Sequence, residues 1–153
     1  MKKEEFEFII QEGEGQFIEF KENFESKGLA KEIVAFANSE GGRIFIGISD
    51  NKKIKGIEIS NELKSQIQDV ARNCDPSIHI ELEAMNNILI INVKEGANKP
   101  YKCSEGFYLR QGSNSQKMSR AEIVEMIINL GNKRFDEILT NIHEYDKTLV
   151  SSY

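Results

Sequence analysis

AFANSEGGRIFIGISD, residues 35–50, is the stretch that decides the fold. Its first residues end an apolar pattern of helical spacing that covers 27–38 and predicts a helix. Gly41-Gly42 ends that helix, and the β-branched run 42–49 that follows predicts a strand. A turn then leads to a short apolar run at 54–57, so we expect the two runs to pair as a hairpin.

Strands and helices alternate irregularly on both sides of this stretch. The unbroken apolar character of 88–93 indicates a central strand. Further expected elements are a helix at 4–11, a strand at 16–22, a helix at 61–73, a strand at 78–83, a hairpin at 99–111 and helices that begin near 119 and 135. Hairpins mixed with helices are typical of an α+β fold, a mixed sheet with helices packed on it.

The C-terminal part begins with a helix start signal. Ser119 and Glu122 have the spacing of a capping box, in which each side chain accepts from the other residue's backbone amide. We expect the helix that follows to end at Gly131. The organisation is therefore a single domain over 1–130 and a helical tail or linker over 131–153.

Composition excludes several classes of protein. The 153 residues are 39% hydrophobic and 29% charged, which is enough to bury a core and excludes a disordered chain. The apolar runs are too short to span a membrane, and acidic residues stand where a secretory signal needs apolar ones. Cys74 and Cys103 are far apart in the sequence, and we expect a reducing cytoplasm.

Charge is segregated along the chain, whose net charge is −5. Residues 1–25 contain eight acidic and three basic side chains, so they account for the whole net charge. Residues 94–120 contain six basic and two acidic side chains. The acidic total therefore does not exclude a nucleic-acid partner, because a local basic stretch can neutralise phosphates.

A first candidate site is acidic. Glu19 and Lys21 alternate with Ile18 and Phe20, so we expect both to point to one face of the strand. Together with Glu14 and Asp50, Glu19 could supply carboxylate ligands to Mg²⁺ or Mn²⁺, and Lys21 could stabilise charge on a phosphate. The same alternation is also typical of a solvated strand face.

A second candidate is rich in glycine. Gly42 and Gly47 precede Ser49 with nearly the spacing of a phosphate-binding loop, but isoleucine stands in the place of its lysine. The residues between the two glycines have strand character. The pattern therefore favours a turn and a packed strand over a nucleotide site.

The third candidate is the basic stretch near the C-terminus. Its basic and aromatic side chains could contact phosphates and bases, and its small polar loop could donate to phosphate oxygens. A solvated hairpin with aromatic side chains facing the core explains the pattern equally well. The candidate contacts are Lys99, Lys102, Tyr108, Arg110, Gly112, Ser113 and Lys117.

These motifs, taken in order, resemble those of the Schlafen AlbA-like domain. The matching blocks are EGQFIEFK at 14–21, AFANSEGGRIFIGISD at 35–50, KPY at 99–101 and YLRQGS at 108–113. The resemblance covers roughly residues 8–130. It implies a nucleic-acid-binding α+β domain of a kind found at the N-terminus of transcriptional regulators. The chain is then either a free-standing member or a fragment of a longer regulator.

The same resemblance implies two alternative functions. Related domains in animal Schlafens are endoribonucleases that use three acids at a divalent metal, and those acids correspond to Glu14, Glu19 and Asp50. Those enzymes hold RNA between two lobes, so a homodimer of this chain would have to replace the second lobe. The second alternative is an ATP-binding or protein-interaction module. Whether the chain is an enzyme stays open at this point.

Overall fold

The computed structural model describes residues 1–151, with side chains described as far as Ile142. The chain divides into two compact units, Met1–Met118 and Ser119–Tyr153.

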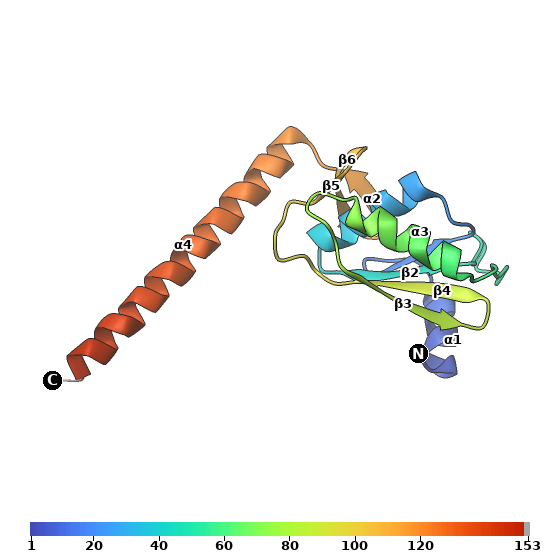
Figure 1. Ribbon diagram of the computed structural model, residues 1–153, viewed down its shortest axis with the longest axis horizontal. Coiled ribbons are helices and arrows are strands. Elements are labelled where there is room, and N and C mark those ends of the chain that lie inside the picture. Colours follow the sequence, from blue (N-terminus) through green and yellow to red (C-terminus); the bar gives the residue numbers. More distant parts are fainter. Residues whose placement is uncertain (152–153) are drawn as a thin grey trace. The chain divides into compact units, whose positions relative to one another are not determined.

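The first unit contains three helices and seven strands (Figure 1). In chain order these are α1 (Lys3–Glu12), β1 (Ile18–Lys21), α2 (Ser26–Asn38), β2 (Gly42–Ile46), α3 (Asn61–Arg72), β3 (Ile80–Met85), β4 (Ile88–Val93), β5 (Lys102–Cys103), β6 (Gly106–Gln111) and β7 (Asn114–Lys117). The expected α+β class is confirmed.

Four strands form a mixed sheet in the order β1-β2-β4-β3. β1 is parallel to β2, whereas β4 is antiparallel to both of its neighbours. The central position expected for 88–93 is therefore confirmed. The expected hairpin between 42–49 and 54–57 is present only in part. Residues 54–57 form no strand, but Ile48 and Ile54 make an antiparallel bridge, and the amides of Lys55 and Gly56 donate to the Gly47 carbonyl at 2.8 Å. The strand partners of β2 are β1 and β4.

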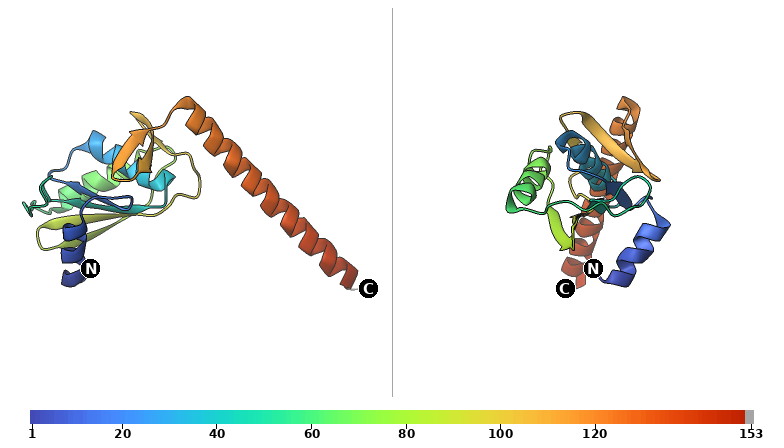
Figure 2. Two further views of the ribbon diagram at one scale, coloured as in Figure 1. Left: turned by 180° about the vertical axis from the view of Figure 1, so that it is seen from behind. Right: turned by 90° about the vertical axis from the view of Figure 1, so that its right-hand side faces the viewer.

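The mixed sheet buries both of its faces. Alternate residues of β2 show this: Ile44 and Ile46 belong to the core cluster beneath α2 and α3, and Phe45 belongs to the cluster beneath α1. Figure 2 (right) shows α1 on one side of the sheet and α2 and α3 on the other. Burial on both faces explains the continuous apolar sequence of β4.

α2 is limited at both ends by specific backbone contacts. The Glu25 carboxylate accepts from the amides of Lys27 and Gly28 at the helix start. At the other end, Gly41 has a φ of 79° and its amide donates to the Phe36 carbonyl at 2.9 Å. A Cβ on Gly42 would lie 2.4 Å from the Phe36 ring, so the glycine pair lets the chain turn back closely into β2.

A second sheet, in the order β5-β6-β7, packs on α2. The β5–β6 hairpin around Ser104 and Glu105 was expected, and β7 was not. Asn38 holds this sheet to the end of α2: its side-chain amide donates to the carbonyls of Tyr101 and Tyr108, both at 2.9 Å, and its oxygen accepts from the Tyr101 amide at 2.7 Å.

The second unit contains one long helix, α4 (Arg120–Ser151). The capping box is confirmed: the Glu122 amide donates to Ser119 Oγ at 3.2 Å, and the Ser119 amide donates to Glu122 Oε1 at 3.0 Å. The expected helix end at Gly131 is wrong, because a single glycine costs a helix only about 1 kcal/mol and its neighbours favour helix. Of the expected tail, 131–151 belongs to α4, and 152–153 lie outside the described residues.

None of the helices in the described part of the chain has both the length and the apolar character needed to cross a bilayer.

Candidate functional site

Glu19 and Lys21 of β1 point to the same face of the sheet, as the alternation predicted. Both side chains meet Glu32 of α2: Lys21 Nζ lies 3.5 Å from Glu32 Oε1, and the charge of Glu32 raises the pKa of Glu19. Glu19 and Glu32 are both buried. Two carboxylates buried side by side need a cation to compensate their charge. A partly exposed lysine compensates them only weakly.

Arg110 of β6 supplies that cation. Its Nη1 lies 2.7 Å from Glu19 and 3.0 Å from Glu32, and it also donates to Ser115 Oγ. Nε and Nη2 donate to the carbonyl of Gly15, and Nη2 also donates to that of Ile18 at 2.8 Å. With 3% of its surface exposed, Arg110 has its guanidinium nitrogens engaged within the protein. We call Glu19, Glu32, Arg110 and Ser115 the buried ion cluster.

Glu19 is the carboxyl of this cluster whose protonation is most affected. Its pKa is raised to about 7, chiefly by burial and also by the charges of Glu32 and Glu14, against the lowering effect of Arg110. Near neutral pH Glu19 is therefore divided between its neutral and charged forms. One guanidinium does not compensate two buried carboxylates fully.

The expected metal centre does not appear in this arrangement. Glu14 lies close enough to raise the pKa of Glu19, and its carboxylate accepts from the Phe20 amide at 3.1 Å. Asp50 is exposed in the turn after β2. Within the described residues, no three His, Cys, Asp or Glu side chains are grouped so that they could hold a metal ion. Arg110 stands at the Glu19 oxygen that a cation would need, so the residues do not fit Mg²⁺ or Mn²⁺ as they lie.

The glycine-rich candidate is a strand and not a phosphate cradle. Gly42–Ile46 is β2, paired on both sides. The amide of Gly47 donates to the Lys21 carbonyl at 2.7 Å. That amide is therefore engaged within the sheet and is not free to bind a phosphate. This agrees with the expectation, based on the missing lysine, that the stretch is a strand.

Three of the seven residues expected to contact nucleic acid are directed inward. Tyr108 and Arg110 lie on the face of β6 that packs on α2, and both are buried. Lys99 donates to the Ser39 carbonyl at 3.0 Å and to Glu95 at 3.1 Å. These three side chains hold the small sheet in place, which corrects the expectation that they contact phosphates or bases.

The other four residues are exposed. Lys102 lies on edge strand β5, Lys117 on edge strand β7, and Gly112 and Ser113 form the turn between β6 and β7. The Gly112 amide is engaged by Gln16 Oε1 at 2.9 Å. Within residues 1–142, neither Lys102 nor Lys117 has a carboxylate within 4 Å.

Lys31 of α2, which is half-buried, lies beside this group and is not predicted by the sequence motifs. Its Nζ lies 5.7 Å from the centre of the Tyr108 ring, and Lys117 is the register partner of Tyr108. Lys31 follows Lys27 at the i, i+4 spacing of one helix face, which was the available signal. By register, Lys117 lies on the face of the small sheet that carries Tyr108, whereas Lys102, the partner of Phe107, points to the opposite face. We call Lys31, Lys102 and Lys117, which lie around this sheet on both of its faces, the lysine surface.

Residues 14–119 match the family described as Schlafen, AlbA_2. Among solved structures, the DIP2311 protein from Corynebacterium diphtheriae is similar in fold, with a TM-score of 0.56 and 22% identity over 72% of this chain and 23% of that one. This chain thus spans less than a quarter of that protein. The N-terminal domain of a RecG-related protein from Nitrosomonas europaea matches with 19% identity, over 76% of this chain and 90% of that domain, at a TM-score of 0.42.

Proposed function

Because the chain belongs to the Schlafen AlbA_2 family, we propose that it binds nucleic acid through the lysine surface. The observation that carries the proposal is the exposure of Lys102 and Lys117 on the outer strands of the small sheet, where neither forms an ion pair within 4 Å among the described residues. Asp75, the backbone bridge partner of Lys102, is the acidic residue beside it in the fold. Such cations bind phosphates by releasing counterions from the nucleic acid.

The geometry supports contacts to the backbone rather than to the bases. Lys102 and Lys117 lie two strand spacings apart, about 10 Å between their Cα atoms, and their side chains point to opposite faces of the small sheet, so a nucleic acid would contact both by following the edge of the sheet. Each is a point charge on a flexible stem, which reads no base sequence. The one tyrosine expected to stack, Tyr108, is buried. We therefore expect affinity with little sequence preference, and the exposed Ser113 hydroxyl adds a neutral donor at the turn.

The proposal is tested by measuring binding to fluorescent duplex DNA and to single-stranded RNA over a range of salt concentrations. The variant Lys102→Ala/Lys117→Ala should bind weakly, and the slope of log K against log salt should fall by about 2, one for each lost phosphate contact. The matched control is Lys3→Ala/Lys53→Ala, which removes the same charge from α1 and from the turn after β2. An equal loss of affinity in the two double variants, or no binding by the wild type at low salt, would contradict the proposal.

The assignment of this domain to a transcriptional regulator is a further part of the proposal, and it depends on the resemblance of the motifs alone. Its test is a comparison of transcript levels with and without the protein, using Lys102→Ala/Lys117→Ala as the variant that should lose the effect.

A metal-dependent endoribonuclease stays the second hypothesis. One observation favours it: Glu14 and Glu19 are close enough for their charges to interact. Because Glu14, Glu19 and Asp50 are not grouped as a metal site as they lie, the hypothesis requires that Asp50 and Arg110 move when a metal ion binds. The sharpest variant is Asp50→Asn, because Asp50 is exposed and its change should not disturb the fold. Cleavage of structured RNA with Mn²⁺ that disappears in this variant and with a chelator would support a nuclease. Cleavage equal in both proteins, or none, would remove the hypothesis.

A further inference from the structure

α4 exposes an apolar strip. Within the described side chains of this helix, seven large hydrophobic residues are between 46% and 60% exposed. They are Val124, Ile127, Ile128, Phe135, Ile138, Leu139 and Ile142. A water-exposed strip of this size is unfavourable by itself and is typical of an interaction surface.

The strip has the spacing of a two-stranded coiled coil. Five of its residues, together with Ala121 and Gly131, fall at alternating steps of three and four, which keeps them on a single seam when the helix winds around a partner. Ile127 and Leu139 flank this seam at a g and an e position. In heptad terms the a positions are Ala121, Ile128, Phe135 and Ile142, and the d positions are Val124, Gly131 and Ile138. Only Gly131 interrupts the apolar pattern within the described side chains.

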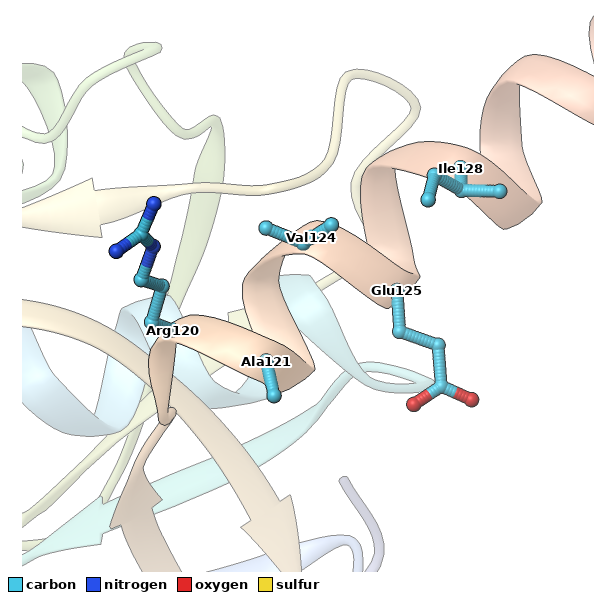
Figure 3. Close-up of a pocket in the computed structure, with 5 residues that line it drawn as sticks. All are labelled: Arg120, Ala121, Val124, Glu125 and Ile128. Carbon is cyan, nitrogen blue, oxygen red and sulfur yellow. The ribbon is translucent and has the colours of Figure 1, made fainter.

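The start of α4 also has a hollow of the shape that coiled coils use. The hollow is lined by Ala121, Val124, Glu125 and Ile128, with Arg120 beside them. These four are residues i, i+3, i+4 and i+7, the set that receives a d-position side chain from a facing helix. Figure 3 shows its two sides, Val124 and Ile128 along one and Ala121 and Glu125 along the other.

We propose that α4 forms a parallel, in-register, two-stranded coiled coil with α4 of a second copy of this chain. In that register the d residue facing the hollow is Val124 of the other copy. Charge complementarity favours the same arrangement: Arg120 takes a g position and Glu125 the following e position, which face each other across a parallel dimer. Because the dimer is symmetric, this opposite-charge pair occurs twice.

Sedimentation equilibrium of the full chain tests the proposal directly. We expect the wild type to have twice the mass of one chain at about 100 µM, because a seam of this length is favourable only when paired. The variant Ile128→Glu/Ile138→Glu should be monomeric at that concentration. The matched control, Asn129→Glu/Thr140→Glu, adds the same charge on the opposite face and should stay dimeric. A monomeric wild type, or an assembly of three or more chains, would overturn the proposal.

A strengthening variant keeps the test independent of folding defects. Gly131 takes a d position, and a Cβ there meets nothing within 4 Å. Gly131→Leu should therefore tighten the dimer at least about tenfold, by adding an apolar contact at the seam. Thr140→Ala, which raises helix propensity away from the seam, is its control. An equal effect of the two changes would contradict a contact at Gly131.

The register is tested with Gly131→Cys under a glutathione disulfide buffer. Parallel helices in register place residue 131 of both copies together, so a covalent dimer linked at this position is expected. Wild type treated in the same way reports any contribution from Cys74 and Cys103, which are both buried. A dimer that cannot be linked at 131 would overturn the parallel register.

Discussion

The Arg110 guanidinium lies 2.7 Å from the Glu19 carboxylate, and this pair unites two sites that looked separate in the sequence. Glu19 was expected to hold a metal ion and Arg110 to contact a phosphate. Each instead compensates the charge of the other inside the protein. The most specific family motifs of this chain therefore stabilise the fold, and the exposed lysines are left as the candidates for binding.

Replacing Arg110 with methionine should destabilise the first unit severely. The change keeps the apolar stem but removes the guanidinium from the buried carboxylates of Glu19 and Glu32 and from the backbone carbonyls that it binds. Among the described residues, Glu32 then retains only the Ser115 hydroxyl and Lys21. Breaking a buried ion pair in this way costs about 3 to 5 kcal/mol in free energy of unfolding, as measured by urea denaturation. Lys102→Met, an equivalent change at an exposed position, should cost less than about 0.5 kcal/mol. A similar loss of unfolding free energy in both variants would show that Arg110 does not stabilise the first unit through the buried ion cluster.

Glu19→Gln should change how stability depends on pH. The pKa of Glu19 is raised from 4.5 to about 7, so between these values the folded chain binds more protons than the unfolded chain. The contribution of Glu19 to the free energy of unfolding is therefore complete below pH 4.5 and is lost as the pH rises through 7. Glutamine stays neutral and still accepts from Arg110.

We therefore expect the stability of Glu19→Gln relative to wild type to increase from pH 4.5 to pH 8 by on the order of 2 kcal/mol. Urea denaturation of both proteins at several pH values measures the difference. A difference that is constant over this range would mean that Glu19 titrates normally.

Asn38→Ala should loosen the small sheet selectively. Its side chain makes three hydrogen bonds to the backbone of Tyr101 and Tyr108, and alanine would leave those buried groups unpaired. We expect a loss of about 2 to 4 kcal/mol, with hydrogen exchange accelerated more in β6 than in β2. Ser39→Ala, which removes one bond to the Arg110 amide, should cost less. Uniform acceleration in both strands would contradict a local role.

The helices and central strands were predictable because their apolar periodicity is local. The capping box at Ser119 and the common face of Glu19 and Lys21 were predictable for the same reason. The face of β6 that meets α2 was not, because an alternating strand has two faces and the sequence does not say which one is covered. That single uncertainty accounts for the misplaced roles of Tyr108 and Arg110.

The other differences between the sequence predictions and the structure have different causes. β7 is short and polar and is held by backbone pairing to β6, so it has no apolar signal. The position of Lys31 beside Tyr108 was not predictable, because the contact joins distant parts of the sequence. Gly131 does not end the helix as expected, because propensity is a weak guide inside a long helix.

The late position of Arg110 in the chain has a consequence for synthesis on the ribosome. Translation releases the chain from its N-terminus, so Glu19, Glu32 and all four strands of the mixed sheet leave the exit tunnel before Arg110 does. Until then the nascent sheet carries two acids whose guanidinium partner has not yet emerged. The first unit can therefore reach its final stability only after nearly all of it has been translated.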